Sequence, residues 1–247
     1  MRPALALAGL TALLLALAPS AEGAGAARPR IALSVSPAQV TLAAPSSRRI
    51  RLRNDGAERV VVDVTRRAVR GQAAAQTWLQ IVPARVLLLS GESAILTLRT
   101  RPPRRAEPGD HHLLVLLRTR PLSGGRVNVQ LRLGVRIKIV VPGRIVRHLA
   151  FGALRVHRRR DARFMFLSVA NRGNVTVQLR GQVGASLVRR GRQLARLSPR
   201  SRSTLRPGAR AVLALRYDGR VRGLVTAVVR IRLGSDIRLE RRYRIRL

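Results

Sequence analysis

The chain has 247 residues, and cysteine is missing from it entirely. An exported protein without cysteine has no disulfide framework, so its domains must depend on ordinary hydrophobic cores. Thiol chemistry and thiolate metal sites are excluded as well. Aromatic residues are also scarce, with three Phe, two Tyr and one Trp. Nucleic-acid modules that stack bases need aromatic platforms, so the sequence indicates no specific nucleic-acid partner.

Residues for catalysis are equally few. The chain has 11 acidic residues and four histidines, and no carboxylate pair has a spacing typical of a general acid and base. There is no G-x-S-x-G motif and no phosphate-binding glycine loop. The neighbours His111 and His112 would point to opposite faces of a strand. We therefore expect no enzymatic activity, no metal site and no cofactor.

The N-terminus is typical of a secretory signal peptide. Arg2 is followed by the apolar run Ala4–Ala18 and then by small residues, which predicts a signal peptide over residues 1–26. The run is shorter than the roughly 20 residues of a spanning helix, and an uncleaved anchor is the alternative. We expect an exported protein, at the cell surface or in the periplasm, without a transmembrane segment in the mature chain.

The formal net charge is +38, and Lys138 is the single lysine among 49 basic residues. Arginine grips carboxylates and phosphates with its planar fork, although codon usage in a GC-rich genome would also favour it. The charge should attract anionic wall polymers, acidic lipids or other polyanions. The densest basic run is Val156–Arg163, so Arg158, Arg159 and Arg160 are candidate binding residues.

Alternation of apolar and polar residues indicates β-strands along most of the chain. In "VNVQLRLGVRIKIVV", residues 127–141, every odd position is Val, Leu or Ile. This predicts a long strand with one face in a core: Val129, Leu131, Val135 and Ile137 should be buried, and Arg132 and Arg136 should point outward. The pairs Asp55-Gly56 and Asp218-Gly219 are typical of hairpin turns.

An internal repeat is visible in two turn-and-strand signals. Asn54 and Asn171 both begin an N-x-G turn, and Gly91 and Gly208 share the pattern L-x-x-G-x-x-A-[IV]-L-x-L-R. Each pair is offset by 117 residues. The repeat predicts an all-β protein with two tandem immunoglobulin-like β-sandwich domains, residues 27–143 and 144–247, which meet near Pro142-Gly143.

The stretch "EPGDHHLLVLLRTRP", residues 107–121, collects an acid and two histidines beside a Pro-Gly turn. The second copy has Gly223 at the corresponding place and neither acid nor histidine. What the copies share is the glycine turn and the following strand. We therefore interpret the stretch as a strand corner and expect surface or turn positions for its histidines.

Four segments together resemble the bacterial WxL-interacting protein family: "SVSPAQVTLAAPSSRRIRLRNDG", "GESAILTLRTRPPRRAEPGDHH", "RVNVQLRLGVRIKIVVPG" and "VANRGNVTVQLRG". The resemblance spans about residues 31–233. It implies a peptidoglycan-binding immunoglobulin-like domain followed by a second sandwich. On this basis the protein would be a non-enzymatic envelope protein that binds a wall component, either peptidoglycan or an anionic polymer, or another surface protein.

The segment "LRLGVRIKIVV" also resembles the long final strand of domain one in periplasmic pilus-assembly chaperones. That resemblance places Lys138 where the chaperones hold a cleft lysine that grips a partner's C-terminal carboxylate. Their companion arginine has no match here, and Gln39 stands nearest. Lys138 and the nearby Arg136 are thus candidate binding residues, and the alternative function is a chaperone for surface or pilus subunits that acts by β-strand addition.

Overall fold

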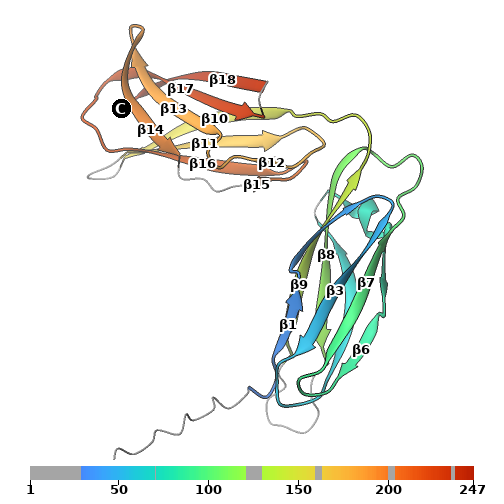
Figure 1. The fold of residues 1–247 in the computed structure, drawn as a ribbon. Helices are drawn as coiled ribbons and strands as arrows, with labels where there is room; N and C mark the ends of the chain where they lie inside the picture. The colour runs from blue at the N-terminus through green and yellow to red at the C-terminus, as the bar shows by residue number, and fades with distance from the viewer. Residues whose placement is uncertain (1–28, 70, 121–129, 159–162, 200–203, 235–236) are drawn as a thin grey trace, which may run out of the picture.

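The computed structural model describes residues 29–69, 71–120, 130–158, 163–199, 204–234 and 237–247 (Figure 1). The predicted signal peptide, residues 1–26, lies outside them. Strands dominate, and the helical element of the described residues is one 3-10 turn, η1 (Ala73–Gln76). The all-β prediction is confirmed. Within the described ranges, no helix has the length and hydrophobicity to cross a membrane.

The N-terminal half is a sandwich of two sheets with strand orders β1-β3-β7-β5 and β2-β9-β8-β4-β6. All neighbouring strands are antiparallel except β2 and β9, which are parallel. Apolar residues of both sheets alternate into one shared core. The strands are β1 (Leu33–Ser36), β2 (Gln39–Ala43), β3 (Ser46–Asn54), β4 (Val60–Ala68), β5 (Leu79–Val82), β6 (Arg85–Leu88), β7 (Ser93–Thr100), β8 (Gly109–Thr119) and β9 (Arg132–Val141).

The C-terminal half has a seven-stranded sheet in the order β10-β11-β16-β14-β13-β17-β18 and a small β12-β15 pair. The sheet folds over on itself, and the hydroxyl of Tyr243 on β18 donates to the carbonyl of Gly152 on β10 at 2.9 Å. The strands are β10 (Leu149–Arg158), β11 (Arg163–Asn171), β12 (Val177–Gln178), β13 (Val183–Arg189), β14 (Arg192–Pro199), β15 (Thr204–Leu205), β16 (Arg210–Tyr217), β17 (Leu224–Leu233) and β18 (Ile237–Arg246).

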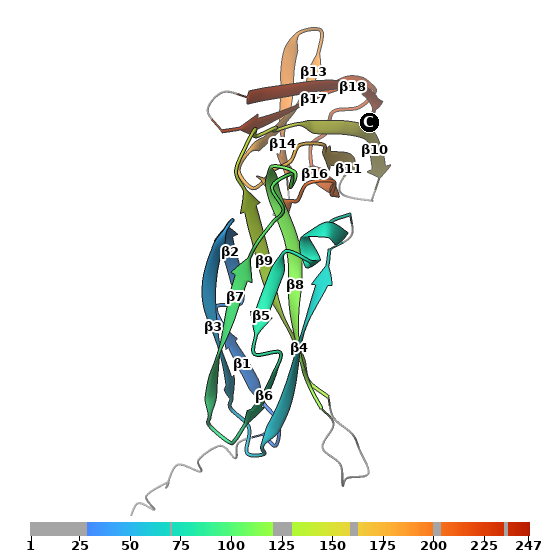
Figure 2. The same cartoon turned by 90° about the vertical axis from the view of Figure 1, so that its right-hand side faces the viewer.

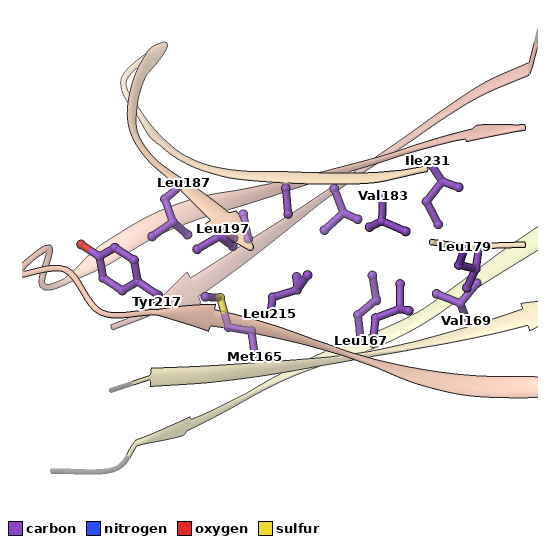
Figure 3. Close-up of a cluster of buried hydrophobic side chains, with 14 of the residues drawn as sticks. Met165, Leu167, Val169, Leu179, Val183, Leu187, Leu197, Leu215, Tyr217 and Ile231 are labelled. Atoms are coloured by element: carbon purple, nitrogen blue, oxygen red, sulfur yellow. The ribbon is translucent and has the colours of Figure 1, made fainter. Parts of the chain in front are cut away.

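Each half has a separate hydrophobic core. The core of the N-terminal half ends in sequence at Val141, and that of the C-terminal half begins at Leu149. Figure 3 shows the second core, with Met165, Leu167 and Leu215 from one layer facing Leu187 and Val183 from the other. Figures 1 and 2 show the two sandwiches set at an angle, with the segment that follows β9 joining them.

The repeat in the sequence corresponds to one buried hydrogen-bonding unit that occurs twice. Asn54 ends β3 and Asn171 ends β11, and both side chains are fully buried. The Asn54 amide donates to the carbonyl oxygens of residues 58, 88 and 89, and the Asn171 amide donates to those of residues 175 and 205. The amides of Gly91 and Gly208 in turn donate to the main-chain oxygens of these asparagines at 2.9 and 3.0 Å. The two halves therefore share a local structure.

The long predicted strand is shorter than expected. β9 begins at Arg132, with Val135 and Ile137 buried and Arg132 exposed, as the alternation predicted. Leu131 precedes the strand and is only half-buried, so its prediction as a core residue was wrong. Val129 lies outside the described residues.

Both predicted hairpin turns were wrong as well. The Asp55-Gly56 turn joins β3 to β4, and these strands belong to different sheets. The Asp218-Gly219 turn leads from β16 toward β17, which pairs with β13 and β18 instead. The strand before each turn already has a neighbour on both sides: β3 lies between β1 and β7, and β16 lies between β11 and β14. The strand after each turn therefore pairs elsewhere, and the turn carries the chain from one layer to the other.

Candidate functional site

The two halves meet where β8 begins. The main-chain amide of Asp110 donates to the carbonyl of Asn174 at 2.8 Å, and the Asn174 side-chain amide donates to the carbonyl of Pro108 at 2.9 Å. The amide of Thr176 donates to Asp110 Oδ2 at 2.8 Å. Asp110 is only 7% exposed. These three bonds join the start of β8 to the segment after β11.

Glycine is required at the start of β8. Gly109 has φ of +121°, and a Cβ atom there would lie 2.1 Å from the carbonyl oxygen of Asn174. Both the backbone conformation and the close approach exclude a larger residue. The Pro-Gly turn of the sequence therefore marks the contact between the halves.

The two histidines of this corner have different surroundings. His111 packs its ring edge-on against Trp78, with ring centroids 4.7 Å apart, and its Nε2 lies 2.7 Å from the carbonyl of Glu107. His112 contacts the other half, with Nε2 2.7 Å from Thr176 Oγ1. Burial, and then the charge of Arg206, lower the pKa of His112 to about 4.

The sequence correctly predicted that a strand begins at this corner. The expectation that both histidines occupy surface or turn positions was wrong for His112. Its side chain and that of Asp110 lie between the halves, because the C-terminal half covers the start of β8. The structure brings together no group of three potential metal-binding side chains within the described ranges.

Lys138 lies beside this junction. Its Nζ is 3.8 Å from Asp110 Oδ2, and its side chain remains 35% exposed. The register places His112 on one side of Lys138 and Thr41 on the other. The ammonium group is therefore held by a nearly buried carboxylate and still reaches solvent, which leaves it able to bind an anion.

A cavity of about 590 Å³ extends from Lys138 across the junction. The N-terminal half contributes Gln39 and Thr41 of β2, His112 of β8, and Arg136 and Lys138 of β9 among other residues, and the C-terminal half contributes Thr176, Thr204 and Arg206. Arg136 stands directly opposite Gln39 in the pairing of β9 with β2. Two of the five residues proposed from sequence, Arg136 and Lys138, thus line one cavity.

The other three proposed residues belong to the basic run at the end of β10. Arg158 is the last residue of that strand. Arg159 and Arg160 lie outside the described residues. A binding site at this run stays a prediction.

Arg206 is the functional candidate that sequence reasoning missed. It adds a third cationic side chain to the cavity wall, and this one comes from the C-terminal half. The repeat held a signal, because the offset of 117 residues aligns Arg206 with Leu89, so an arginine replaces an apolar residue at that place. Its closeness to Lys138 depends on how the halves meet, which no local pattern encodes.

Among the described strands, none pairs with the first residues of β9 on its β2 side. Parallel pairing with β2 covers Arg136–Val140, and the last bond at this end runs from the Arg136 amide to the carbonyl of Ala38 at 3.0 Å. The preceding residues of β9, Arg132–Val135, extend beyond β2. Main-chain groups at such an edge can pair with an added strand.

Comparison with solved structures finds proteins with a similar overall fold and low sequence identity. A chain from a chaperone–tip adhesin complex of CFA/I fimbriae matches 85% of this chain and 98% of its own length, with 13% identity and a TM-score of 0.54. The YadV chaperone covers 86% of this chain and 99% of its own length, with 12% identity and a TM-score of 0.48. The E. coli chaperone DraB covers 88% of this chain and 98% of its own length, with 13% identity and a TM-score of 0.46. No family model and no curated protein matches the chain. The WxL-interacting resemblance therefore stays a prediction, and the fold agrees with the resemblance to pilus chaperones.

Proposed function

We propose that the protein is a non-enzymatic, extracytoplasmic chaperone-like protein that binds the C-terminal segment of another envelope protein. The observation that carries the proposal is Lys138, held by Asp110 in a cavity between two β-sandwiches and facing solvent. The fold similarity to a chain from a chaperone–adhesin complex supports the same class of partner. A binding role of this kind needs no catalytic group and no cofactor.

The cavity offers three cations to a carboxylate. Lys138 comes from the N-terminal half and Arg206 from the C-terminal half, and Arg136 lies at the same wall. In this proposal Arg206 takes the place of the arginine that the sequence lacks at Gln39. Hydrogen bonds between charged partners are worth about 1.5–3 kcal/mol, enough to discriminate a free carboxylate from an amide.

The open part of β9 completes the proposed site. A partner segment whose carboxylate occupies the cavity could extend along Arg132–Val135 and pair with the main chain of β9. Each half would form one domain, residues 27–143 and 144–247, with the partner's carboxylate bound between them. Binding of a peptidoglycan component gains no support from the comparisons.

The test uses the mature chain and a synthetic peptide of alternating valine and threonine, with either a free or an amidated C-terminus. We expect amidation to raise the dissociation constant roughly tenfold or more, as loss of a charge-assisted hydrogen bond predicts. In the Lys138→Met variant, and separately in Arg206→Gln, the two peptides should bind nearly alike.

The matched control is Arg118→Met, an exposed cation of β8 outside the cavity lining. It should keep the full preference for the free carboxylate. Equal binding of both peptides by the unsubstituted protein, or equal effects of the Lys138 and Arg118 substitutions, would contradict the proposal. Because Arg206→Gln leaves the Lys138–Asp110 pair intact, it separates lost binding from lost folding.

A further inference from the structure

Seven exposed arginines share one face of the C-terminal half. The sheet order β14-β13-β17-β18 makes their strands neighbours, and Figure 1 shows β13, β17 and β18 together along the upper part of this half. Strand pairing puts them on the same side: Ser186 stands opposite both Arg196 and Val228, and Val228 stands opposite Arg242. This arginine face consists of Arg196 on β14, Arg230 and Arg232 on β17, and Arg238, Arg242, Arg244 and Arg246 on β18.

One carboxylate accompanies the seven guanidinium groups. Glu240 accepts hydrogen bonds from Arg242 Nε at 2.9 Å and Arg230 Nε at 2.8 Å, and these bonds lower its pKa. Seven arginines and one glutamate leave this face with a net charge of +6. The described residues provide no ion pair for the other five arginines.

The arrangement is unfavourable without an anion. Arg232 stands directly opposite Arg238, and like charges in directly opposed positions destabilise a sheet. Arg242, Arg244 and Arg246 alternate along β18, so their Cα atoms recur about every 7 Å. A ligand with repeated negative charges would relieve this repulsion.

The face also contains a depression. A cavity of about 320 Å³ lies among Arg196, Arg230 and Arg232. Gly184 and Ser186 of β13 also line it, and Gly184 has no side chain to fill the space between the arginines. Three cationic side chains around a small cavity favour the binding of an anionic group.

We propose that the arginine face binds a linear phosphate-bearing polymer, with one phosphate in the depression and others along β18. The arginine fork matches phosphate oxygens in pairs, which favours phosphate over a diffuse anion. A flexible chain can follow the twist of the sheet, whereas a planar bilayer would contact only part of it. This surface differs from the cavity between the halves, and the inference does not depend on the proposed chaperone function.

The experiment measures binding of long-chain inorganic polyphosphate to the mature chain over a series of salt concentrations. A triple variant, Arg196→Gln with Arg232→Gln and Arg244→Gln, removes three charges without disturbing the Glu240 pairs. A matched triple variant, Arg49→Gln with Arg51→Gln and Arg99→Gln, removes three exposed charges from the N-terminal half. Circular dichroism and thermal unfolding verify that both variants fold.

We expect the arginine-face variant to bind polyphosphate at least tenfold more weakly. The slope of log K against log salt should fall by about two, since each lost phosphate contact on a single-stranded polyanion contributes about 0.7. The matched variant should change affinity by less than about threefold. Equal losses from the two variants would overturn the proposal, because the charge would then act diffusely. Binding to anionic lipid vesicles without binding to polyphosphate would also overturn it, in favour of a lipid surface.

Discussion

Two buried asparagines fix the turns that follow β3 and β11. A side-chain amide that is fully enclosed must find hydrogen-bond partners, since an unpaired polar group in a core costs about 1–3 kcal/mol. Asn54 satisfies carbonyls from the turn that follows it and from the end of β6, and its own Oδ1 accepts the amide of Gly56. The corresponding bonds of Asn171 include the amide of Gly173. Asn54 therefore connects the two layers of the N-terminal half, and Asn171 connects β11 to β15.

Replacing either asparagine should lower the stability of the folded protein. Asn54→Ala or Asn171→Ala strips partners from several buried main-chain groups at once, so we expect a loss of about 3 kcal/mol or more in the free energy of unfolding. Urea denaturation monitored by circular dichroism measures it. Gln80→Ala, at an exposed position of β5, serves as the control and should change stability by less than about 0.5 kcal/mol. Similar small losses at all three positions would show that the asparagines do not fix the turns.

His112 should make stability depend on pH. Its pKa is lowered in the folded protein to about 4, below its ordinary value of 6.5, so the unfolded chain binds more protons between these values. Stability should therefore fall as pH decreases from about 6.5 toward 4. Four groups act on the imidazole: Arg206, Lys138 and His111 disfavour its protonation, and Asp110 favours it.

The test compares urea midpoints of the unsubstituted protein and of His112→Gln at pH 7 and pH 5. Glutamine can retain a hydrogen bond to Thr176 but does not titrate. We expect a smaller loss of stability on acidification in the variant. The same loss in both proteins would assign the pH dependence to other groups.

At the scale of single elements, alternation in the sequence was a reliable guide. Val135 and Ile137 are buried and Arg132 and Arg136 are exposed, because a strand with one face in a core permits only one register. The equal spacing of Asn54 and Asn171 from their glycines also corresponded to a shared structure. In both cases the signal and the structure concern residues close together in the sequence.

The partner of a strand was much harder to predict. The Asp55-Gly56 turn has a hairpin sequence, yet β3 pairs with β1 and β7 and not with β4. Turn residues specify only a reversal of the chain, whereas sheet membership depends on strands far away in the sequence. The arginine face was hidden for the same reason: its residues belong to β14, β17 and β18, and only the sheet order brings them together.

At the scale of the whole molecule, the proposed binding site depends on how the two sandwiches meet. The cavity with Lys138 and Arg206 exists only because the start of β8 contacts the segment after β11. The sequence predicted a boundary near Pro142-Gly143 but gave no orientation. Tight contacts at Gly109 and hydrogen bonds from Asn174 supply that orientation.

Gly109→Ala should loosen this junction without unfolding either core. The added methyl group would lie 2.1 Å from the Asn174 carbonyl oxygen, and the backbone conformation at φ +121° is unfavourable for alanine. The clash can be relieved if the two halves move apart, because their hydrophobic cores share no residues.

We expect small-angle X-ray scattering of the Gly109→Ala variant to show a larger radius of gyration, with strand content by circular dichroism close to that of the unsubstituted protein. The variant should also prefer the free-carboxylate peptide less strongly than the unsubstituted protein does, because Arg206 would move away from Lys138. Gly184→Ala is the control, because an added Cβ there meets nothing within 4 Å and the residue lies on β13, away from the proposed peptide site. If the Gly109 variant kept both its radius of gyration and its peptide preference, the contact at Gly109 would not orient the halves.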